Sequence, residues 1–409
     1  MKIVHVSTYD AGGAASAMLQ LHKGLLNLRI DSSILSASKT RNDILHLHTC
    51  ERSLPEARLF QKVLNRFGFP QTTEQKDWWV INKLKIKDYL RFGKNTGSRL
   101  FFSPNSPYYL EDHTLIKEAD IIHLHWISGF VNYPTFFNKI KKPIVWTFHD
   151  KGVILGGFHL LLDYTKSSKA WKKQSDYYRQ KKSEYIQSHN NISIVAPSKV
   201  LLNYSRSSYF FRSPHYHIFY SIDTKVFYVQ NLARQKKTLF LIIGDLQHYH
   251  KGFDILLGAL KIIKRDDFEI AVIGNADAKT LADYPQLKLI GRINDEKKLA
   301  SFYNQADALL LPSREDNLPN VMLESLACGT PVIATPIGGM LDVIESGLNG
   351  ILSKDVTSQS FSEAMSKFFE IKNNFDREKI GREAASLFSS EKQASSYLKI
   401  YNELLGGIK

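Results

Sequence analysis

The sequence contains very little cysteine, and this shortage narrows the kind of protein it can encode. Cys50 and Cys328 are its only cysteines, which argues against a disulfide framework or a thiolate zinc site and favours a reducing cytoplasm. It also lacks any apolar run close to the roughly 20 residues of a membrane span. The start, Met1–Ser7, has the pattern of a strand and not of a signal peptide. We therefore expect a cytoplasmic protein without a membrane span.

Acidic residues are scarce in the first half of the chain. Residues 1–210 hold 30 Lys and Arg against 16 Asp and Glu, whereas residues 211–409 hold 24 of each. A basic half of this kind favours a polyanionic partner, either an anionic membrane surface or nucleic acid. Because no nucleic-acid module is recognisable, we expect no nucleic acid and a peripheral position on an anionic inner-membrane surface. The alternative is that scattered lysines only aid solubility.

Length and composition are those of an ordinary globular protein. The 409 residues are 43% hydrophobic and 23% charged, which suggests two or three domains with full cores. From residue 238 to residue 352, short apolar runs alternate with helical patterns. Strict alternation of this kind predicts an α/β fold with a parallel, doubly wound sheet.

The most informative stretch runs from residue 308 to residue 335. Ala308–Leu311 is too short for a helix and is closed by Pro312, which predicts a buried parallel strand. Pro319 suits a first helical turn, and Gly329 suits the far cap. A helix N-terminus at the carboxyl end of a parallel strand is a ready site for an anion such as a diphosphate.

Acidic side chains in the same loop indicate a second kind of ligand. Glu315 and Asp316 would repel a diphosphate, so their sensible partners are the hydroxyl groups of a sugar or ribose. Asn320 and Glu324 are four residues apart on one helix face and add two further hydroxyl ligands. The alternative is a solvated acidic loop with a capping role.

Two other loops have features that suit a phosphate. Gly12 and Gly13 follow the first strand and allow a ligand to approach the next helix closely, although a Gly-Gly pair alone is weak evidence. Lys251, in the loop after the strand Thr238–Gly244, is a point charge able to hold a phosphate oxygen. It could equally be an ordinary surface lysine, and Arg292 could likewise be a surface residue.

Histidines end two further buried strands, at 119–126 and 143–150. Because ligands bind beyond the carboxyl ends of parallel strands, His125, His149 and Asp150 should face a ligand site. His123 and His125 point the same way, but no third ligand follows at metal spacing, so no metal is expected. The sequence also lacks an Asp-x-Asp after a strand, and this gives no reason to expect a catalytic metal.

Three stretches of the first half have less definite patterns. Residues 55–70 have the pattern of a basic amphipathic helix, which could lie on a membrane or pack on its own domain. Residues 71–111 lack clear periodicity and are expected to be an insertion that could line an acceptor site. Lys166–Lys182 is expected to be mostly a solvated helix face, and could hold the diphosphate of a lipid-linked acceptor.

The stretch from Pro312 to Ala334 resembles a known signature. Its pattern, Pro-Ser-x-x-acid, seven residues, Glu, then Ala-x-Gly-x-Pro-Val-Ile-Ala, is similar to the donor-sugar motif of the retaining glycosyltransferases of family 4. The string Ala11–Asn27 resembles the capsule and exopolysaccharide subgroup. The resemblance implies the GT-B fold, with two Rossmann-like doubly wound parallel-sheet domains facing across a cleft. It divides the chain into an acceptor domain with a basic insertion at about 50–115, a nucleotide-sugar domain and a helix crossing back, at residues 1–215, 216–390 and 391–409.

The resemblance also implies roles for individual residues. Four are implied to be catalytic: His149, Lys251, Glu315 and Asp316. The donor-binding set is implied to be Gly12, Gly13, Ala14, His250, Lys251, Arg292, Ser313, Leu318, Pro319, Asn320, Val321 and Glu324. The acceptor side is implied to include His125, Trp126, Asp150, Gly157 and His159. Two departures matter, since Asp316 stands where the family usually has Glu, and the Arg usually paired with Lys251 is replaced by Asp245 or His250.

The function implied is a metal-independent, retaining transfer of a sugar from a nucleotide sugar, UDP more than GDP, with no cofactor. The acceptor implied is a glycan or a lipid-diphosphate-linked oligosaccharide in bacterial surface polysaccharide biosynthesis. Two alternatives stay open, a nucleotide-sugar epimerase of the same fold and a non-catalytic protein that binds a glycan or nucleotide.

Overall fold

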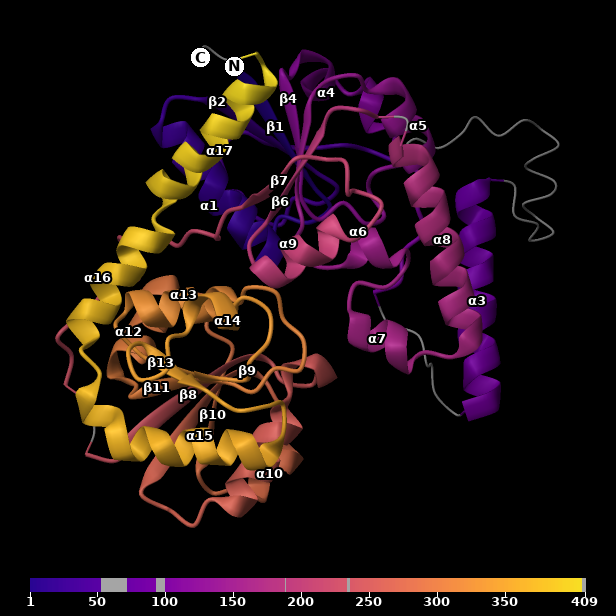
Figure 1. The fold of residues 1–409 in the computed structure, drawn as a ribbon. Coiled ribbons are helices and arrows are strands. Elements are labelled where there is room, and N and C mark those ends of the chain that lie inside the picture. Colours follow the sequence, from indigo (N-terminus) through magenta and orange to yellow (C-terminus); the bar gives the residue numbers. More distant parts are fainter. Residues whose placement is uncertain (53–71, 93–99, 188, 234–235, 407–409) are drawn as a thin grey trace. The chain divides into compact units, whose positions relative to one another are not determined.

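The structure is a computed structural model that describes five stretches of the chain, residues 1–52, 72–92, 100–187, 189–233 and 236–406. Its internal contacts divide the chain into two units, labelled by element in Figure 1. The first unit comprises residues 1–197, 201–218 and 394–409, and the second comprises residues 198–200 and 219–393. The predicted basic helix at 55–70 lies outside the described residues.

The first unit is built on a seven-stranded sheet in the order β3-β2-β1-β4-β5-β6-β7. Every neighbouring pair is parallel. The strands are β1 Lys2–Ser7, β2 Asp31–Ser36, β3 Leu47–Thr49, β4 Ile121–Leu124, β5 Ile144–Thr147, β6 Ile192–Ala196 and β7 His215–His217. The last strand, His215–His217, spans the boundary predicted between residues 215 and 216, and the main part of the second unit starts at Phe219.

Helices cover both faces of the first sheet. The helices wholly or mostly in this unit are α1 Gly13–Asn27, α3 Thr73–Phe92, α4 Thr114–Glu118, α5 Tyr133–Lys139, α6 Gly152–Leu155, α7 Leu161–Lys166, α8 Lys169–Gln187, α9 Lys199–Arg206 and α17 Ser390–Leu404, with the 3-10 turn η1 Leu110–Asp112. One buried cluster joins the sheet to α5 and α9. A second cluster joins its other face to α1 and α17, so the last helix packs on the first unit.

The second unit is built on a six-stranded parallel sheet in the order β10-β9-β8-β11-β12-β13. The strands are β8 Thr238–Asp245, β9 Phe268–Asn275, β10 Leu287–Gly291, β11 Ala308–Leu311, β12 Val332–Ala334 and β13 Gly350–Leu352. The helices are η2 Tyr249–Lys251, α10 Phe253–Ile262, α11 Ala278–Ala282, α12 Glu296–Gln305, α13 Asn320–Ala327, α14 Met340–Val343, α15 Ser358–Ile371, η3 Lys372–Asn374 and α16 Arg377–Phe388. The parallel, doubly wound α/β prediction is thus confirmed for both units.

The sequence of residues 71–111 shows no clear periodicity, yet part of this expected insertion is helical. Residues 73–92 form the 20-residue helix α3. Its pattern is concealed because two carboxylates, Asp77 and Asp88, are buried while Trp78 and Leu90 are exposed. An amphipathic helix is recognised by apolar residues on its buried face, and α3 places several of its apolar residues on the opposite face.

The described helices include none that combines the length and the apolar character needed to cross a bilayer.

Candidate functional site

Two loops of the second unit meet at the carboxyl edge of its sheet. The loop after β8 carries Lys251, and the loop after β11 carries Asp316. Lys251 Nζ lies 2.7 Å from Asp316 Oδ2, and the two side chains are 31% and 17% exposed. The backbone N–H of Arg314 also donates to the carbonyl of His250 at 2.7 Å. The structure therefore brings together a predicted phosphate ligand and a predicted sugar ligand.

The side chain of Arg314 connects the loop after β11 to residues that follow β8. Its guanidinium donates to both carboxylate oxygens of Asp254, at 2.5 and 2.7 Å. It also lies 4.1 Å from the ring centre of Tyr249. The hydrogen bond from Arg314 lowers the pKa of Asp254. Sequence reasoning did not select Arg314, because nothing in the local pattern showed that its partner is Asp254 in the first turn of α10.

Glycine is required where these loops approach each other. Gly252 has φ +66°, and a Cβ on it would lie 1.9 Å from the carbonyl oxygen of Pro312. Gly338, in the loop after β12, has φ +49°, and its Cβ would lie 2.1 Å from the carbonyl oxygen of Asp316. Three loops therefore converge on the backbone around Asp316.

Helix α13 begins in this group of loops. Pro319 is its N-cap and does not lie in the first turn as predicted, and among the described residues no side chain caps this end. Its first N–H groups, including that of Val321, are thus the kind of donors that bind an anion. Ser313 and Leu318 are buried, at 2% and 3% exposed, so their side chains pack beneath the surface of the loop.

Glu324 lies one turn along α13 from Asn320. The hydroxyl of Tyr303 donates to its carboxylate at 2.9 Å. Burial raises the pKa of Glu324 to about 7. A partly buried carboxylate with few donors around it is suited to accept hydrogen bonds from ligand hydroxyl groups.

Three other predicted site residues, Arg292, His250 and Glu315, also lie in the second unit. Arg292 is exposed on the loop after β10, an edge strand separated from β8 by β9. His250 contributes its carbonyl, and its ring stacks on His248 at 5.4 Å. The N–H of Glu315 lies 3.4 Å from that same carbonyl.

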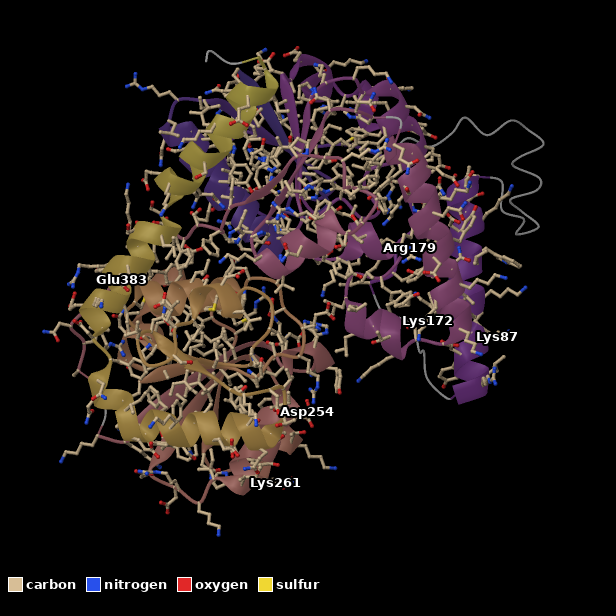
Figure 2. The ribbon with its side chains drawn as sticks, viewed as in Figure 1. Lys87, Lys172, Arg179, Asp254, Lys261 and Glu383 are labelled. Carbon is tan, nitrogen blue, oxygen red and sulfur yellow. The ribbon has the colours of Figure 1, made fainter. Side chains whose placement is uncertain are left out.

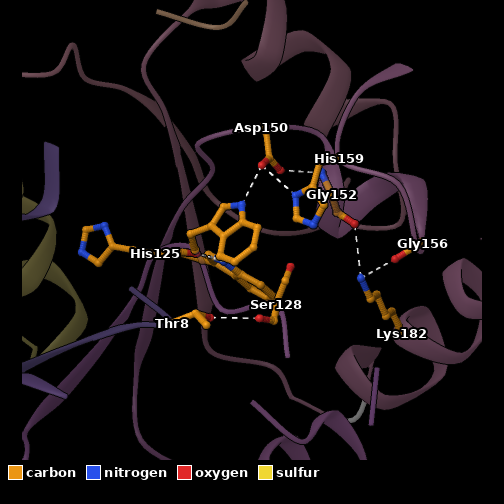
Figure 3. A network of polar contacts seen from close by, with 10 residues as sticks. Thr8, His125, Ser128, Asp150, Gly152, Gly156, His159 and Lys182 are labelled. Atoms are coloured by element: carbon orange, nitrogen blue, oxygen red, sulfur yellow. Dashed lines mark hydrogen bonds and ion pairs between the residues drawn. The ribbon is translucent and has the colours of Figure 1, made fainter. Parts of the chain in front are cut away.

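In the first unit, Asp150 is the centre of a second polar group, drawn in Figure 3. Its Oδ2 accepts from Trp126 Nε1 and pairs with His159 Nδ1, each at 2.8 Å, and its Oδ1 accepts from the N–H of Gly152 at 2.7 Å. Burial alone would raise the pKa of Asp150, but His159 and these donors hold it below its ordinary value. Three predicted acceptor-side residues are therefore joined through one carboxylate.

Aromatic rings surround this carboxylate. Trp126 stacks on His159 at 4.8 Å on one side and on Tyr9 at 5.4 Å on the other. Phe102 meets Trp126 edge-on at 5.4 Å, and Tyr9 is 46% exposed. Stacked rings with one exposed face suit the apolar side of a sugar ring. Sequence reasoning missed Tyr9 and Phe102, which lie far from Trp126 along the chain.

Two predicted glycine positions differ in surroundings. Gly12 is exposed and has φ +96°. An added Cβ on Gly12, or on the exposed Gly13, would have nothing within 4 Å. The adjacent Ala14 is half-buried in the first turn of α1. Gly157, in contrast, would place a Cβ 2.3 Å from the ring of Phe101. It is a packing position, so nothing in its surroundings supports ligand contact.

Lys182 is an exception within the stretch Lys166–Lys182, which was expected to be mostly a solvated helix face. It is 3% exposed, and burial lowers its pKa to about 7. Its ammonium group donates to the carbonyls of Gly152 and Gly156, at 3.2 and 2.5 Å (Figure 3). Lys182 therefore holds the loop that contains the partners of Asp150.

Three histidines form a hydrogen-bonded line across the sheet. His5 Nδ1 lies 2.9 Å from His125 Nε2, and His125 Nδ1 lies 3.1 Å from His149 Nε2. Burial lowers the pKa of each ring, to about 4 for His149, so all three are neutral at pH 7.

The line has a preferred direction. A neutral ring has one N–H and one acceptor nitrogen. Among the described residues, the buried Nε2 of His5 has no partner. Because an orphaned buried N–H is rarer than an unused acceptor, we expect His5 to donate to His125 and His125 to His149. The proton of His149 then lies on its Nδ1.

His5, His123 and His125 also form the one group of potential metal ligands found among the described residues. The sequence argument missed His5, which comes from β1 and is the register partner of His123. Both nitrogens of His123 already bond to hydroxyls, those of Tyr401 and Thr147, at 2.6 and 2.8 Å. The ring of His123 is therefore already hydrogen-bonded on both sides within the protein.

A pocket of about 840 Å³ opens beside α8 and α9 in the first unit. Its lining mixes aromatic, charged and hydroxyl side chains, among them Lys173, Asp176, Tyr177, Arg179, Tyr204 and Tyr209. Part of the basic stretch Lys166–Lys182 therefore lines a concave surface.

Comparison with known proteins gives a family match for part of the chain. Residues 237–370 match the family model described as glycosyl transferases group 1. An uncharacterized glycosyltransferase of Methanocaldococcus jannaschii is 33% identical over 165 residues, which cover 38% of this chain and 45% of that protein. An uncharacterized 41.2 kDa protein in the cps region of Klebsiella pneumoniae is 25% identical over 300 residues, covering 70% and 79%. The first of these matches thus spans less than half of the relative.

Solved structures agree over nearly the whole chain. Sucrose-phosphate synthase from Thermosynechococcus elongatus has a TM-score of 0.68 at 19% identity and covers 99% of each chain. Anabaena HepE, in complex with UDP and glucose, has a TM-score of 0.64 at 14% identity and covers 98% of this chain and 99% of its own. At these identities the likeness establishes the fold, which is GT-B. Lys251, Asp316 and Glu324 all lie in the segment that matches the glycosyltransferase model.

Replacement of Gly252 by Ala tests the loop contact. The left-handed φ costs a non-glycine residue about 1–3 kcal/mol, and the clash with Pro312 adds to that cost. The matched control is Gly347→Ala, which has φ +89° but nothing within 4 Å of its Cβ. We expect Gly252→Ala to lower the free energy of unfolding by clearly more than the control does, as measured by denaturant titration. Equal losses would contradict the close approach.

The buried histidines predict acid sensitivity. Their folded pKa values lie below the unfolded value of about 6.5, so stability is present above that pH and falls as the pH drops toward 4. One ring with a folded pKa of about 4, as for His149, lowers the free energy of unfolding by roughly 2 kcal/mol between pH 8 and pH 5.

His5→Phe should therefore flatten this decline, although the variant will be less stable at pH 8 because His125 loses its partner. Thermal unfolding at pH 8, 6 and 5 measures the effect. His48→Gln, at an exposed position, is the control and should leave the decline intact. An unchanged decline in His5→Phe would show that the buried rings do not control it.

Proposed function

We propose that the protein transfers a sugar from a nucleotide sugar to a saccharide acceptor, as a retaining, metal-independent glycosyltransferase of family 4. The observation that carries the proposal is the meeting of Lys251 and Asp316 at the start of α13. This geometry lies within the segment that matches the glycosyltransferase model. It provides a cation, a row of N–H groups and a carboxylate in one place.

Each part of a nucleotide sugar has a suitable partner in the second unit. Lys251 and the N–H groups of Asn320 and Val321 hold the diphosphate. Glu324 accepts hydrogen bonds from the ribose hydroxyls, and Asp316 or Glu315 accepts them from the sugar. UDP is proposed as the nucleotide, ahead of GDP, and the UDP bound to HepE supports this choice by analogy of fold.

The first unit has groups that suit the transferred sugar and the acceptor. His149 is neutral, because burial lowers its pKa to about 4, so its N–H can donate to a sugar hydroxyl without adding charge. Trp126, His159 and Asp150 combine stacked rings with a carboxylate, which is the chemistry that binds saccharides. The pocket beside α8 adds Lys173 and Arg179 for an acceptor with a lipid-linked diphosphate.

The reaction proposed needs no base from the protein. The bond between the anomeric carbon and the diphosphate oxygen breaks as the acceptor oxygen bonds to that carbon on the same face. The acceptor proton passes to the departing diphosphate oxygen. The protein positions both substrates, and Lys251 and α13 stabilise the charge that develops on the leaving group. The Klebsiella relative in a cps region supports a role in surface polysaccharide biosynthesis.

The epimerase alternative uses the same donor site without an acceptor. It would release a free epimerised sugar nucleotide, whereas the transferase would release the nucleoside diphosphate only when acceptor is present. The non-catalytic alternative would bind nucleotide and produce neither.

Lys251→Ala should weaken binding of both UDP and inorganic diphosphate at least tenfold, because the cation contacts the phosphate oxygens in both. Calorimetric titration without metal measures the two affinities, and the melting temperature supports them, since ligand at 100 times Kd stabilises by about 2.7 kcal/mol. The matched control is Lys261→Ala on α10, which should bind as the parent does. Equal binding by Lys251→Ala would remove Lys251 from the diphosphate site.

Glu324→Gln should separate ribose binding from stability. Its effect on affinity should appear with UDP but not with inorganic diphosphate, which has no ribose. Because the folded pKa of Glu324 is raised to about 7, ionisation costs stability as the pH rises from about 4.5 to above 7. The variant should therefore gain roughly 3 kcal/mol at pH 8 and less than about 1 kcal/mol at pH 5. Unchanged UDP binding would exclude Glu324 from the ribose site.

A further inference from the structure

We infer that the exposed face of α3 binds the surface of an anionic lipid bilayer. This inference goes beyond the proposed transfer reaction, because it concerns where the protein is held, and its test measures no activity. The charge of the first half predicted such a partner without locating the surface that meets it.

Large apolar side chains are concentrated on one side of α3. At about 100° per residue they span a sector of about 120° around the helix axis. Their exposed fractions are 67% for Trp78, 48% for Trp79, 62% for Ile86, 67% for Tyr89 and 81% for Leu90. An exposed apolar surface of this kind marks an interaction site.

The opposite side of α3 is fixed to the rest of the first unit. Asp88 accepts from Trp171 Nε1 at 2.7 Å, and α3 lies beside α8, which carries Trp171 (Figure 1). Asp77 bonds to the side chains of Ser103 and Asn105. Ile81 and Leu84 pack against a buried cluster that also contains Trp171. Because these contacts fix the rotation of the helix, its aromatic side is held outward.

Basic residues border the apolar sector. Lys85 lies next to it on one side, and Lys76, Lys83 and Lys87 lie on the other by helical spacing. Lys83 Nζ is 4.9 Å from the ring centre of Trp79, and Lys87 projects from the helix in Figure 2. Aromatic residues with flanking lysines are the composition of a helix lying in the headgroup region of an anionic membrane.

The positive charge of the α3 face favours an anionic bilayer over the other possible partners. A second copy of the chain packed on this face would bring its own lysines against these lysines. A neutral glycan would stack on the rings but leave the lysines without partners. An anionic bilayer matches both features, because its negative surface potential attracts lysines that lie close to it.

The test is binding of the full-length protein to vesicles of equal parts phosphatidylglycerol and phosphatidylcholine, compared with pure phosphatidylcholine. We expect sedimentation with the anionic vesicles and little with the neutral ones. We also expect a blue shift of tryptophan fluorescence, because Trp146 and Trp171 are fully buried and Trp126 is partly buried. Trp78→Ser/Trp79→Ser should abolish the shift and weaken binding at least tenfold.

The charge arm uses matched triple variants. Lys76→Gln/Lys83→Gln/Lys87→Gln should weaken binding to anionic vesicles at least tenfold. Lys261→Gln/Lys264→Gln/Lys297→Gln changes the net charge equally on exposed positions of the second unit and should bind nearly as the parent does. All replaced side chains are exposed, and circular dichroism checks that each variant is folded.

Three results would overturn the inference. The parent could fail to bind anionic vesicles, or bind both kinds equally. The tryptophan variant could bind as the parent does. Sedimentation equilibrium could show a dimer that the tryptophan variant loses, which would make this face a contact between copies of the chain.

Discussion

The close approach of two loops at the carboxyl edge of the second sheet is the constraint on which the proposed donor site depends. Parallel strands end at one edge, so their loops must share a small space. Gly252 lets the backbone reach the carbonyl of Pro312, and Arg314 joins the loops through Asp254. With the loops fixed, Lys251 and Asp316 meet at 2.7 Å. A diphosphate can then take the place of Asp316 beside Lys251, and a sugar hydroxyl can take the place of Lys251 beside Asp316.

The first unit differs in that it buries many polar groups. Buried polar groups are costly unless they are hydrogen-bonded. Asp150 has three hydrogen-bond partners, and Lys182 donates to two carbonyls. The line of hydrogen-bonded histidines runs from His5 on β1 through His125 to His149. These partners hold the loops after β4 and β5 in place. The same cost makes the unit sensitive to acid, because a buried imidazole that gains a proton becomes a charge without water around it.

The sequence predicted the parts of the molecule that depend on local pattern. The alternation of strands and helices after residue 238 predicted the second sheet. Pro312 marked the end of β11, and Pro319 and Gly329 marked the limits of α13 to within a residue or two. Contacts between distant residues were not accessible in this way. His5 shows no sign of its partner His125 until β1 and β4 pair, and Arg314 shows none of Asp254. Helix α3 was missed because its carboxylates are buried and its tryptophans exposed, the reverse of the pattern by which helices are recognised.

The most direct test of the central claim is a structure of the protein with UDP bound. The account predicts that the diphosphate lies between Lys251 Nζ and the first N–H groups of α13, with the ribose on Glu324 and without a metal ion. Asp316 would then turn from Lys251 toward the position of the sugar. UDP bound away from Lys251 and α13, or a diphosphate held only through a metal ion, would contradict the account.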